Sequence, residues 1–394
     1  MSLTYVITRP KEQLIGFLLE DDRLVEIRPD RTGRSLLGDI YIGKVKQVVK
    51  NINAAFVEIA GGQLCFLPLE DAVDPVLVNR SADGRLLAGD EILVQVKKDA
   101  VKTKDPVLSA NLSINGRYFL VQTGAKEGGL SFSRKLDQKQ CERIRRALQG
   151  LAIPGQMTLI VRTRAQDADP ELLLRDAARQ IGRAQRILEV GHTRTVFSLL
   201  SEHMPDYLKP LGEGLWPLPD RIVTDDPAVH TAVLGFLREQ GQSTDCLELY
   251  RDSRISLSLL YGLSSRLEEA LSRQIWLKSG GYLVIEPTEA LTVIDVNTGK
   301  YADHKPTEET FFLINEEAAK ESLRQIRLRN LSGIVLIDFI NMKDRENNRR
   351  LLSLLREIAA LDPVPVKVVD MTPLGLVEIT RKKIERPLEE QLCR

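Results

Sequence analysis

Two apolar runs that each end at an aspartate constrain the fold of this 394-residue chain more than any other feature. Residues 291–297 read LTVIDVN and residues 333–339 read GIVLIDF, and one helical pattern over residues 307–330 separates them. A strand–helix–strand crossover of this kind is right-handed and makes its two strands parallel in one sheet. We therefore expect Asp295 and Asp338 at the carboxyl-terminal edge of an α/β sheet, where the active sites of such sheets gather.

The two aspartates predict a metal site. An ionised carboxylate at the edge of a core is costly unless a cation or a donor compensates it. Asn297 and Asn341 stand close to the aspartates in sequence, so the expected pocket is rich in oxygen ligands, which suits Mg²⁺. One such aspartate is better explained as a turn cap. Two at equivalent places around one helix favour the metal, with Asp295 and Asp338 as its ligands.

Basic residues gather at the end of the connecting helix. Arg324 and Arg327 are three residues apart and share one helix face. A second basic cluster occupies residues 381–383. Such residues either complement the helix dipole in solvent or hold a polyanion. We predict that together they hold a polyanion next to the metal.

The remaining chain predicts a mixed α and β protein built from several units. Residues 1–34 form a strand hairpin that is too small to fold alone and should dock on a later segment. Five short alternating strands between residues 38 and 113 fit a small barrel of the OB type. Strands and helices then mix, and a helix over residues 265–277 leads into the aspartate unit.

The barrel carries candidates for binding a single-stranded nucleic acid. Phe56 and Phe66 lie in two of its strands, and the segment VKKDAVKTK adds lysines that include Lys98 and Lys104. Barrels of this type stack bases on aromatic rings beside basic groups. Packing in the core is an equally good interpretation of each phenylalanine, so the lysines are the better signal.

Two further places suit a phosphate group. Arg162 and Thr163 end a strand and offer a guanidinium beside a hydroxyl. Gly129 follows another glycine, and backbone amides at such a turn can approach a phosphate closely. Each signal is weak by itself, because many strand ends offer the same groups.

Composition narrows the setting. The 55 basic and 55 acidic residues balance, so net charge identifies no partner. The four cysteines form no C-x-x-C pair, which argues against a disulfide framework and a zinc ribbon. The sequence contains no apolar signal region and no apolar run of membrane-spanning length. We expect a cytoplasmic protein with reduced thiols and no membrane segment.

Taken together, these residues resemble the bacterial ribonuclease E/G family of endoribonucleases. The resemblance covers nearly the whole chain, and LTVIDVNTG and IVLIDFINM are its most specific motifs. In chain order it is carried by GDIYIGKVKQVVKNINAAFVEIA, LIVRT, LKSGGYLVIEPTEALTVIDVNTGKY, LRQIRLRNLSGIVLIDFINM and LGLVEITRKK.

The resemblance implies an α+β multidomain fold. A discontinuous RNase H-like subdomain would hold an inserted S1 barrel of the OB fold and a sensor for the RNA 5′ end, followed by a DNase I-like α/β subdomain. The RNase H-like part would be a structural remnant without its own active site. The implied boundaries are 1–34 and 207–270 for the RNase H-like subdomain, 35–112 for the S1 barrel, 113–206 for the sensor region and 271–394 for the DNase I-like subdomain.

The resemblance also implies an activity and its residues. The chain would cleave single-stranded RNA with Mg²⁺, leaving 5′-phosphate and 3′-hydroxyl ends, in mRNA decay and in the processing of rRNA precursors. Asp295 and Asp338 would be the Mg²⁺ ligands and Asn297 would support them. Phe56, Phe66 and Lys104 would grip single-stranded RNA, and a 5′-monophosphate would be held by Arg162 and Thr163 with the backbone near Gly129. From the residue pattern, Lys98, Arg324 and Arg327 are further candidates for RNA binding.

Two departures from the family pattern limit this expectation. The family's second motif usually reads IDFIDM, and Asn341 replaces its last carboxylate here. The family continues into a C-P-x-C zinc link and a small oligomerising domain, whereas this sequence ends one residue after Cys393. We therefore expect no zinc in this chain, and a homodimer is the assembly to consider rather than a tetramer.

Two other functions stay open at this stage. A chain of the same architecture could bind RNA with little or no turnover when the oligomerising tail is missing. A DNA nuclease is a weaker alternative, because stacking surfaces tolerate DNA but the family pattern points to RNA.

Overall fold

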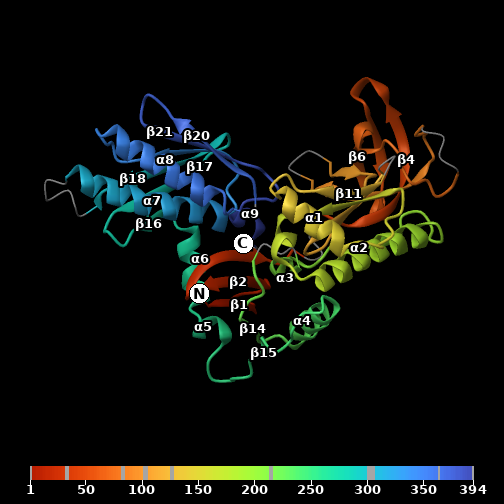
Figure 1. Cartoon of the computed structure of the whole chain (residues 1–394), viewed down its shortest axis with the longest axis horizontal. Helices are drawn as coiled ribbons and strands as arrows, with labels where there is room; N and C mark the ends of the chain where they lie inside the picture. Colours follow the sequence, from red (N-terminus) through yellow and green to blue (C-terminus); the bar gives the residue numbers. More distant parts are fainter. Residues whose placement is uncertain are drawn as a thin grey trace. The chain divides into compact units, whose positions relative to one another are not determined.

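The computed structural model of the chain describes residues 2–31, 35–80, 85–100, 105–124, 128–212, 216–299, 307–362 and 364–392. The chain divides into two compact units, one of Met1–Asp30 with Pro219–Arg394 and one of Arg31–Leu218. The first unit is therefore discontinuous, and the second is inserted into it. The fold is mixed α+β, with a closed five-stranded barrel and three further sheets (Figure 1).

The N-terminal hairpin docks on a later segment, as expected. Its first strand pairs in parallel with a strand more than 200 residues away, with Tyr5 opposite Ile222. Val6, Phe17 and Val223 are buried in the core of this sheet. The sheet has the order β15-β14-β1-β2-β3. Its elements, with the nearby helices, are β1 Leu3–Thr8, β2 Ile15–Glu20, β3 Arg23–Pro29, β14 Arg221–Thr224, α4 Pro227–Glu239, β15 Leu247–Leu249, α5 Leu257–Leu260 and α6 Leu263–Leu271.

A second sheet of this unit carries the aspartate motifs. Six strands run in the order β16-β17-β18-β19-β21-β20, and the helices α7 and α8 cover one face of the sheet over an apolar core (Figure 1). The elements are β16 Gln274–Trp276, β17 Tyr282–Pro287, β18 Leu291–Asn297, α7 Glu308–Leu328, β19 Gly333–Asp338, α8 Arg345–Ala359, β20 Val366–Met371, β21 Leu376–Arg381 and α9 Leu388–Gln391.

The helix predicted over residues 265–277 is too long. Helix α6 ends at Leu271, and residues 274–276 form the edge strand β16 instead. The physical reason is pairing, because Ile275 lies opposite Leu283 and both side chains are buried in the sheet's core.

The five predicted barrel strands are all present in the second unit. Strand β4 pairs with both β5 and β7, and this double pairing closes the barrel. Inward-facing side chains such as Val57, Leu67 and Val94 are fully buried. The elements are β4 Ile40–Val49, η1 Lys50–Ile52, β5 Ala54–Glu58, η2 Ala60–Gly62, β6 Leu64–Pro68, η3 Leu69–Asp71, β7 Glu91–Lys98, β8 Val107–Ser109 and β13 Leu199–Ser201, which extends the sheet beside β4.

A four-stranded sheet with two helices completes this unit. Its order is β11-β12-β10-β9, and its core is continuous with Ile40, Ile42 and Leu93 of the barrel. Among the described residues, no helix has both the length and the apolar character needed to cross a membrane. The elements are β9 Ser113–Asn115, β10 Phe119–Thr123, β11 Gly129–Phe132, α1 Gln138–Ala147, β12 Met157–Val161, η4 Thr163–Asp167, α2 Pro170–Gly191, η5 Asp206–Leu208 and α3 Lys209–Gly212.

Candidate active site

The structure places the two predicted aspartates directly opposite each other. Strands β18 and β19 are parallel neighbours, and Asp295 is the register partner of Asp338. Adjacent strands put such partners about 4.8 Å apart at the backbone. Both aspartates are exposed, whereas Ile294 and Ile337, one residue earlier, are buried under the helices. The carboxylates therefore share the uncovered face at the carboxyl-terminal edge of the two strands.

The electrostatics of this pair favour a cation. Partial burial and then the neighbouring charge of Asp295 raise the pKa of Asp338 above its usual value. Asn297 donates a hydrogen bond from Nδ2 to Oδ2 of Asp295 at 2.8 Å, which orients that carboxylate. Mg²⁺ is commonly held by one or two carboxylates, with water and substrate phosphate as its other ligands. The donor set of Asp295 and Asp338 fits this ion.

Apart from the aspartate pair, we looked at the distribution of side chains that commonly bind metals in the part of the chain that the structure describes. No cluster of three or more histidine, cysteine or acidic side chains occurs there. Cys65, Cys141 and Cys246 are free thiols, and Cys393 lies outside the described residues.

A buried amide on α7 fixes the segment that follows Asp338. Asn315 is fully buried and donates from Nδ2 to the carbonyl of Ile340 at 2.7 Å. Oδ1 of Asn315 accepts the backbone N–H of Ile340 at 3.0 Å. Asn315 was not among the predicted site residues, although a polar side chain on the apolar face of the helix FLINEEAAK was a visible signal.

Two glycines let the turn between β16 and β17 approach the end of β18. Gly299 has φ +57°, and a Cβ there would lie 2.1 Å from the carbonyl oxygen of Gly280. A Cβ on Gly281 would lie 2.7 Å from the carbonyl oxygen of Asn297. Glu317 of α7 accepts the backbone N–H groups of residues 278 and 279 at 2.6 and 3.0 Å, so the turn is anchored to the helix layer.

The prediction that Arg324 and Arg327 lie beside the aspartate pair is wrong. They sit in the last turns of α7, a 21-residue helix about 30 Å long that runs back to the start of β19. Arg324 Nη1 donates to the carbonyl of Leu24 at 2.6 Å, and Arg327 Nη2 donates to that of Val25 at 3.4 Å. These guanidinium groups therefore bind strand β3 of the N-terminal hairpin. This contact lies near the first residues of β19, whereas Asp338 is the last residue of that strand.

The second basic cluster is also displaced from the aspartates. Arg381 is the register partner of Gly333, the first residue of β19, whereas Asp338 pairs with Leu376. Arg381 is buried, and its Nε donates to Asp362 at 3.0 Å. Its role in the described structure is therefore an internal ion pair.

The barrel brings its predicted aromatic residues together on its surface. Phe56 and Phe66 are register partners on β5 and β6, and their rings meet edge to face with centroids 6.0 Å apart. Both are partly exposed, unlike their buried neighbours. Phe66 pairs onward with Val107, and Val107 with the exposed Lys98. One row across the barrel therefore carries two rings and a cation, while Lys104 lies outside the described residues.

The predicted phosphate residues separate into two places. Strands β11 and β12 are parallel, with Gly129 opposite Thr158 at their start. Arg162 and Thr163 follow the other end of β12, about 13 Å away by strand geometry. The prediction that the backbone at Gly129 joins them in one site is therefore wrong. Ser133, which follows β11, takes that place, and its Oγ lies 3.1 Å from Oγ1 of Thr163.

More cations gather at this strand end than the sequence indicated. Arg162 donates from Nη1 to the carbonyl of Gly116 at 2.9 Å, and this contact brings Arg117 close. Burial first, and then the positive charges of Arg117 and Arg162, lower the pKa of Arg164 to about 10. Three guanidinium groups and two hydroxyls therefore form one strongly cationic corner, which is suited to an anion.

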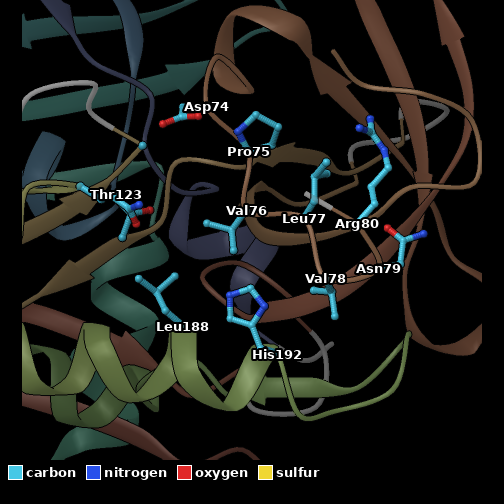
Figure 2. Close-up of a pocket in the computed structure, with 12 residues that line it drawn as sticks. Asp74, Pro75, Val76, Leu77, Val78, Asn79, Arg80, Thr123, Leu188 and His192 are labelled. Carbon is cyan, nitrogen blue, oxygen red and sulfur yellow. The ribbon is translucent and has the colours of Figure 1, made fainter. Parts of the chain in front are cut away.

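A separate cavity lies within the second unit. Figure 2 shows its lining, in which the segment over residues 74–80 faces Leu188 and His192 of the C-terminal end of α2 and the residue that follows it. Its volume is about 630 Å³. Arg80 is held by Asp90 through bonds of 2.6 and 2.9 Å. None of the residues predicted to bind metal, RNA or phosphate lines this cavity.

Comparison with known proteins converges on one family. The profile of the Ribonuclease E/G family matches residues 113–384. Ribonuclease G of Escherichia coli (strain K12) is 32% identical over 397 residues, covering 98% of this chain and 80% of that protein. Ribonuclease G of Salmonella typhimurium is 31% identical with the same coverage. Ribonuclease E of Synechocystis sp. is 33% identical over 91% of this chain, which spans 54% of that protein.

Proposed function

The chain belongs to the Ribonuclease E/G family, and on that premise we propose that it is a Mg²⁺-dependent endoribonuclease acting on single-stranded RNA. The observation that carries the proposal is the direct opposition of Asp295 and Asp338 on the open face of the sheet. The proposed products carry 5′-phosphate and 3′-hydroxyl ends. The proposed substrates are mRNA and rRNA precursors in the cytoplasm, with a homodimer as the working assembly.

The side chains around the aspartates have separable roles in this proposal. Asp295 and Asp338 would hold the ion, which would act as a Lewis acid toward the scissile phosphate. Asn297 keeps the Asp295 carboxylate oriented, and Asn315 fixes the backbone that follows Asp338. Water attacks the phosphorus in line with the leaving 3′ oxygen. The downstream product therefore keeps the phosphate at its 5′ end.

RNA binding is assigned to the second unit. Phe56 and Phe66 stack bases of the single strand, and Lys98 neutralises a phosphate in the same row. Lys104, which lies outside the described residues, joins them on the sequence pattern and the resemblance. The chain's barrel is proposed as the S1 domain, and the sheet that contains the N-terminal hairpin as the RNase H-like part.

The cationic corner is assigned to the 5′ end of the substrate. Thr163 and Ser133 offer hydroxyls to a terminal phosphate, and Arg162 offers charge beside Arg117 and Arg164. Charge-assisted hydrogen bonds of this kind favour an ionised phosphate over a hydroxyl end. A 5′-monophosphate would then raise the rate of cleavage farther along the same strand.

A direct test incubates the chain with A/U-rich single-stranded RNA bearing a 5′-monophosphate, with Mg²⁺ or with chelator, and maps both product ends. The proposal expects Mg²⁺-dependent internal cuts with 5′-phosphate and 3′-hydroxyl ends. A deoxyribose version of the same oligonucleotide should stay intact. Tight binding without any cut would favour an RNA-binding module instead, and equal cleavage of DNA would favour a general nuclease.

A further inference from the structure

An exposed pair of aromatic rings stands on the aspartate sheet. Trp276, on the edge strand β16, is 63% exposed, which is unusual for so large an apolar side chain. Its ring lies beside that of Tyr282 on β17, with centroids 5.2 Å apart and planes tilted by 56°. The pair faces away from the helices α7 and α8, because the next residues, Ile275 and Leu283, point into the core beneath them.

The strand register places these rings in the row next to the aspartates. Trp276 is opposite Tyr282, and Tyr282 is opposite Asn297. Directly opposite residues project from the same face of a sheet. Asn297 bonds Asp295, which lies two residues earlier on the same face. By strand geometry, the Cα atoms of Tyr282 and Trp276 lie about 8 and 12 Å from that of Asp295.

The row of the open face beside the aspartates, on the side away from the carboxyl-terminal edge, is poorly suited to a polyanion. The row beyond the aspartates holds Glu286 and Glu378 on either side of Val293 and Leu336. Glu286 forms an ion pair with Arg273, and the other side chains of this row are acidic or aliphatic, so the row has no excess positive charge to attract a phosphate backbone. A single strand that reaches the aspartates is therefore directed along the carboxyl-terminal edge, where the two aromatic rings lie.

The backbone next to the two rings is anchored. Glu317 anchors the turn that follows Trp276 by accepting the backbone N–H groups of Lys278 and Ser279. Partial burial tends to raise the pKa of Glu317, but its hydrogen bonds with Ser279 and Lys278 have the larger effect and lower that pKa. The close contact of Gly281 with the backbone of Asn297 locks the same turn to the metal-binding strand. A stacking surface held in place before binding loses little entropy when a base arrives.

We propose that Trp276 and Tyr282 form a stacking platform for an RNA base that neighbours the scissile phosphate. This inference rests on the proposed nuclease function and adds to it a base-binding site beside the catalytic residues. Because a ring stack of this kind is made equally in the ground state and the transition state, it should act mainly on KM rather than on kcat.

Fluorescence provides a test that does not depend on cleavage. The chain contains two tryptophans, so a Trp216→Phe variant leaves Trp276 as the sole reporter. With chelator present, A/U-rich RNA should quench this signal. An RNA that lacks the base next to the cut should quench it less than an RNA that lacks a distant base. Trp276 fluorescence that changes with protein concentration but not with added RNA would overturn the proposal. It would favour an interface between two copies of the chain instead.

Kinetics provide the second test. With Mg²⁺, Trp276→Ala should raise KM roughly 5- to 100-fold, the range expected for one lost base stack, with little change in kcat. Trp276→Phe should retain most of the affinity. Leu259→Ala, at a 70% exposed apolar residue of α5, is the matched control and should leave KM unchanged.

The outcomes separate the platform from the nuclease. Normal cleavage by the wild-type chain together with a wild-type KM for Trp276→Ala would refute the platform and leave the nuclease standing. Quenching of Trp276 by RNA in the Trp216→Phe chain, when the wild-type chain never cuts RNA, would support the two rings as an RNA contact and refute the nuclease.

Discussion

Asn315 holds the backbone of Ile340 from both sides, donating to its carbonyl at 2.7 Å and accepting its N–H at 3.0 Å. Ile340 comes two residues after Asp338, so the helix layer fixes the strand end that carries one of the two carboxylates. A side chain that touches neither substrate nor ion can therefore set the geometry of the site.

Replacing Asn315 with leucine tests this positioning role. Two buried backbone groups would lose their partners, and we expect the free energy of unfolding to fall by about 1–3 kcal/mol. Mg²⁺ affinity or the cleavage rate should fall about 10- to 100-fold, as for other residues that orient metal ligands. Urea unfolding and a Mg²⁺ titration of cleavage measure the two effects.

Ser322→Ala provides the control for that variant. Ser322 is also fully buried on α7, but its hydroxyl makes no hydrogen bond within the described residues. Its removal should leave both stability and Mg²⁺ dependence close to wild type. An Asn315→Leu chain that folds and cleaves like the Ser322→Ala chain would contradict the positioning role.

The aromatic pair on the barrel makes a second prediction. Phe56→Ala or Phe66→Ala should weaken binding of single-stranded RNA by about 1–3 kcal/mol, because each removes one stacking surface. Ile52→Ala, at a 54% exposed residue of the same barrel, should not change the affinity. Fluorescence anisotropy with a labelled oligonucleotide measures all three. Equal affinities would mean that the two rings only pack against each other.

The cationic corner predicts discrimination at the 5′ end. Thr163→Val removes a hydroxyl that lies 3.1 Å from that of Ser133 while keeping the side-chain volume. We expect it to lower the ratio of cleavage rates between 5′-monophosphate and 5′-hydroxyl RNA. The rate with 5′-hydroxyl RNA should stay unchanged, because that end has no phosphate to lose. A ratio near one in the wild-type chain would contradict the assignment.

A buried histidine predicts a pH dependence of stability. His203 lies against Asp39 at 2.8 Å, and this hydrogen bond is the main reason why the pKa of His203 is raised above its ordinary 6.5. Burial opposes the shift, and the charge of Asp206 adds to it. Because the pKa of His203 is raised in the folded chain, protonation of His203 stabilises the fold. This stabilisation is complete below the unfolded-state pKa of 6.5 and is lost as the pH rises through the folded-state pKa.

Unfolding midpoints measured from pH 5 to 9 test this contribution. The wild-type chain should lose stability toward high pH relative to His203→Gln, whose side chain cannot titrate. Parallel curves for the two chains would show that the Asp39–His203 pair adds no pH-dependent stability.

The aspartate site could be predicted from the sequence because short segments of the chain are enough to indicate it. Asp295 and Asp338 each end an apolar run, and one helix between two strands determines their parallel pairing. The barrel followed from alternating residues in the same way. Arg324 was misplaced because nearness in sequence says little about which end of a long helix faces the site. Gly129 was misplaced because the parallel register of β11 and β12 is not visible in either segment alone.

Residues that act through tertiary contacts carried the weakest sequence signal. The local sequence around Trp276 favours a helix, and only the pairing of Trp276 with Tyr282 on β17 places it on the aspartate face. Ser133 reaches Thr163, and Arg117 acts on Arg164, from other segments of the chain, so neither forms a sequence motif with its partner. Composition and periodicity could not have identified them.

The most direct test of the account compares Asp295→Asn and Asp338→Asn with Asp370→Asn, an exposed aspartate on β20 of the same sheet. Cleavage of 5′-monophosphorylated RNA in Mg²⁺ and binding of the same RNA are measured for each chain. The account predicts that both site variants bind RNA and lose cleavage, while Asp370→Asn does both like the wild type. Mg²⁺-dependent cleavage retained by both site variants would contradict it.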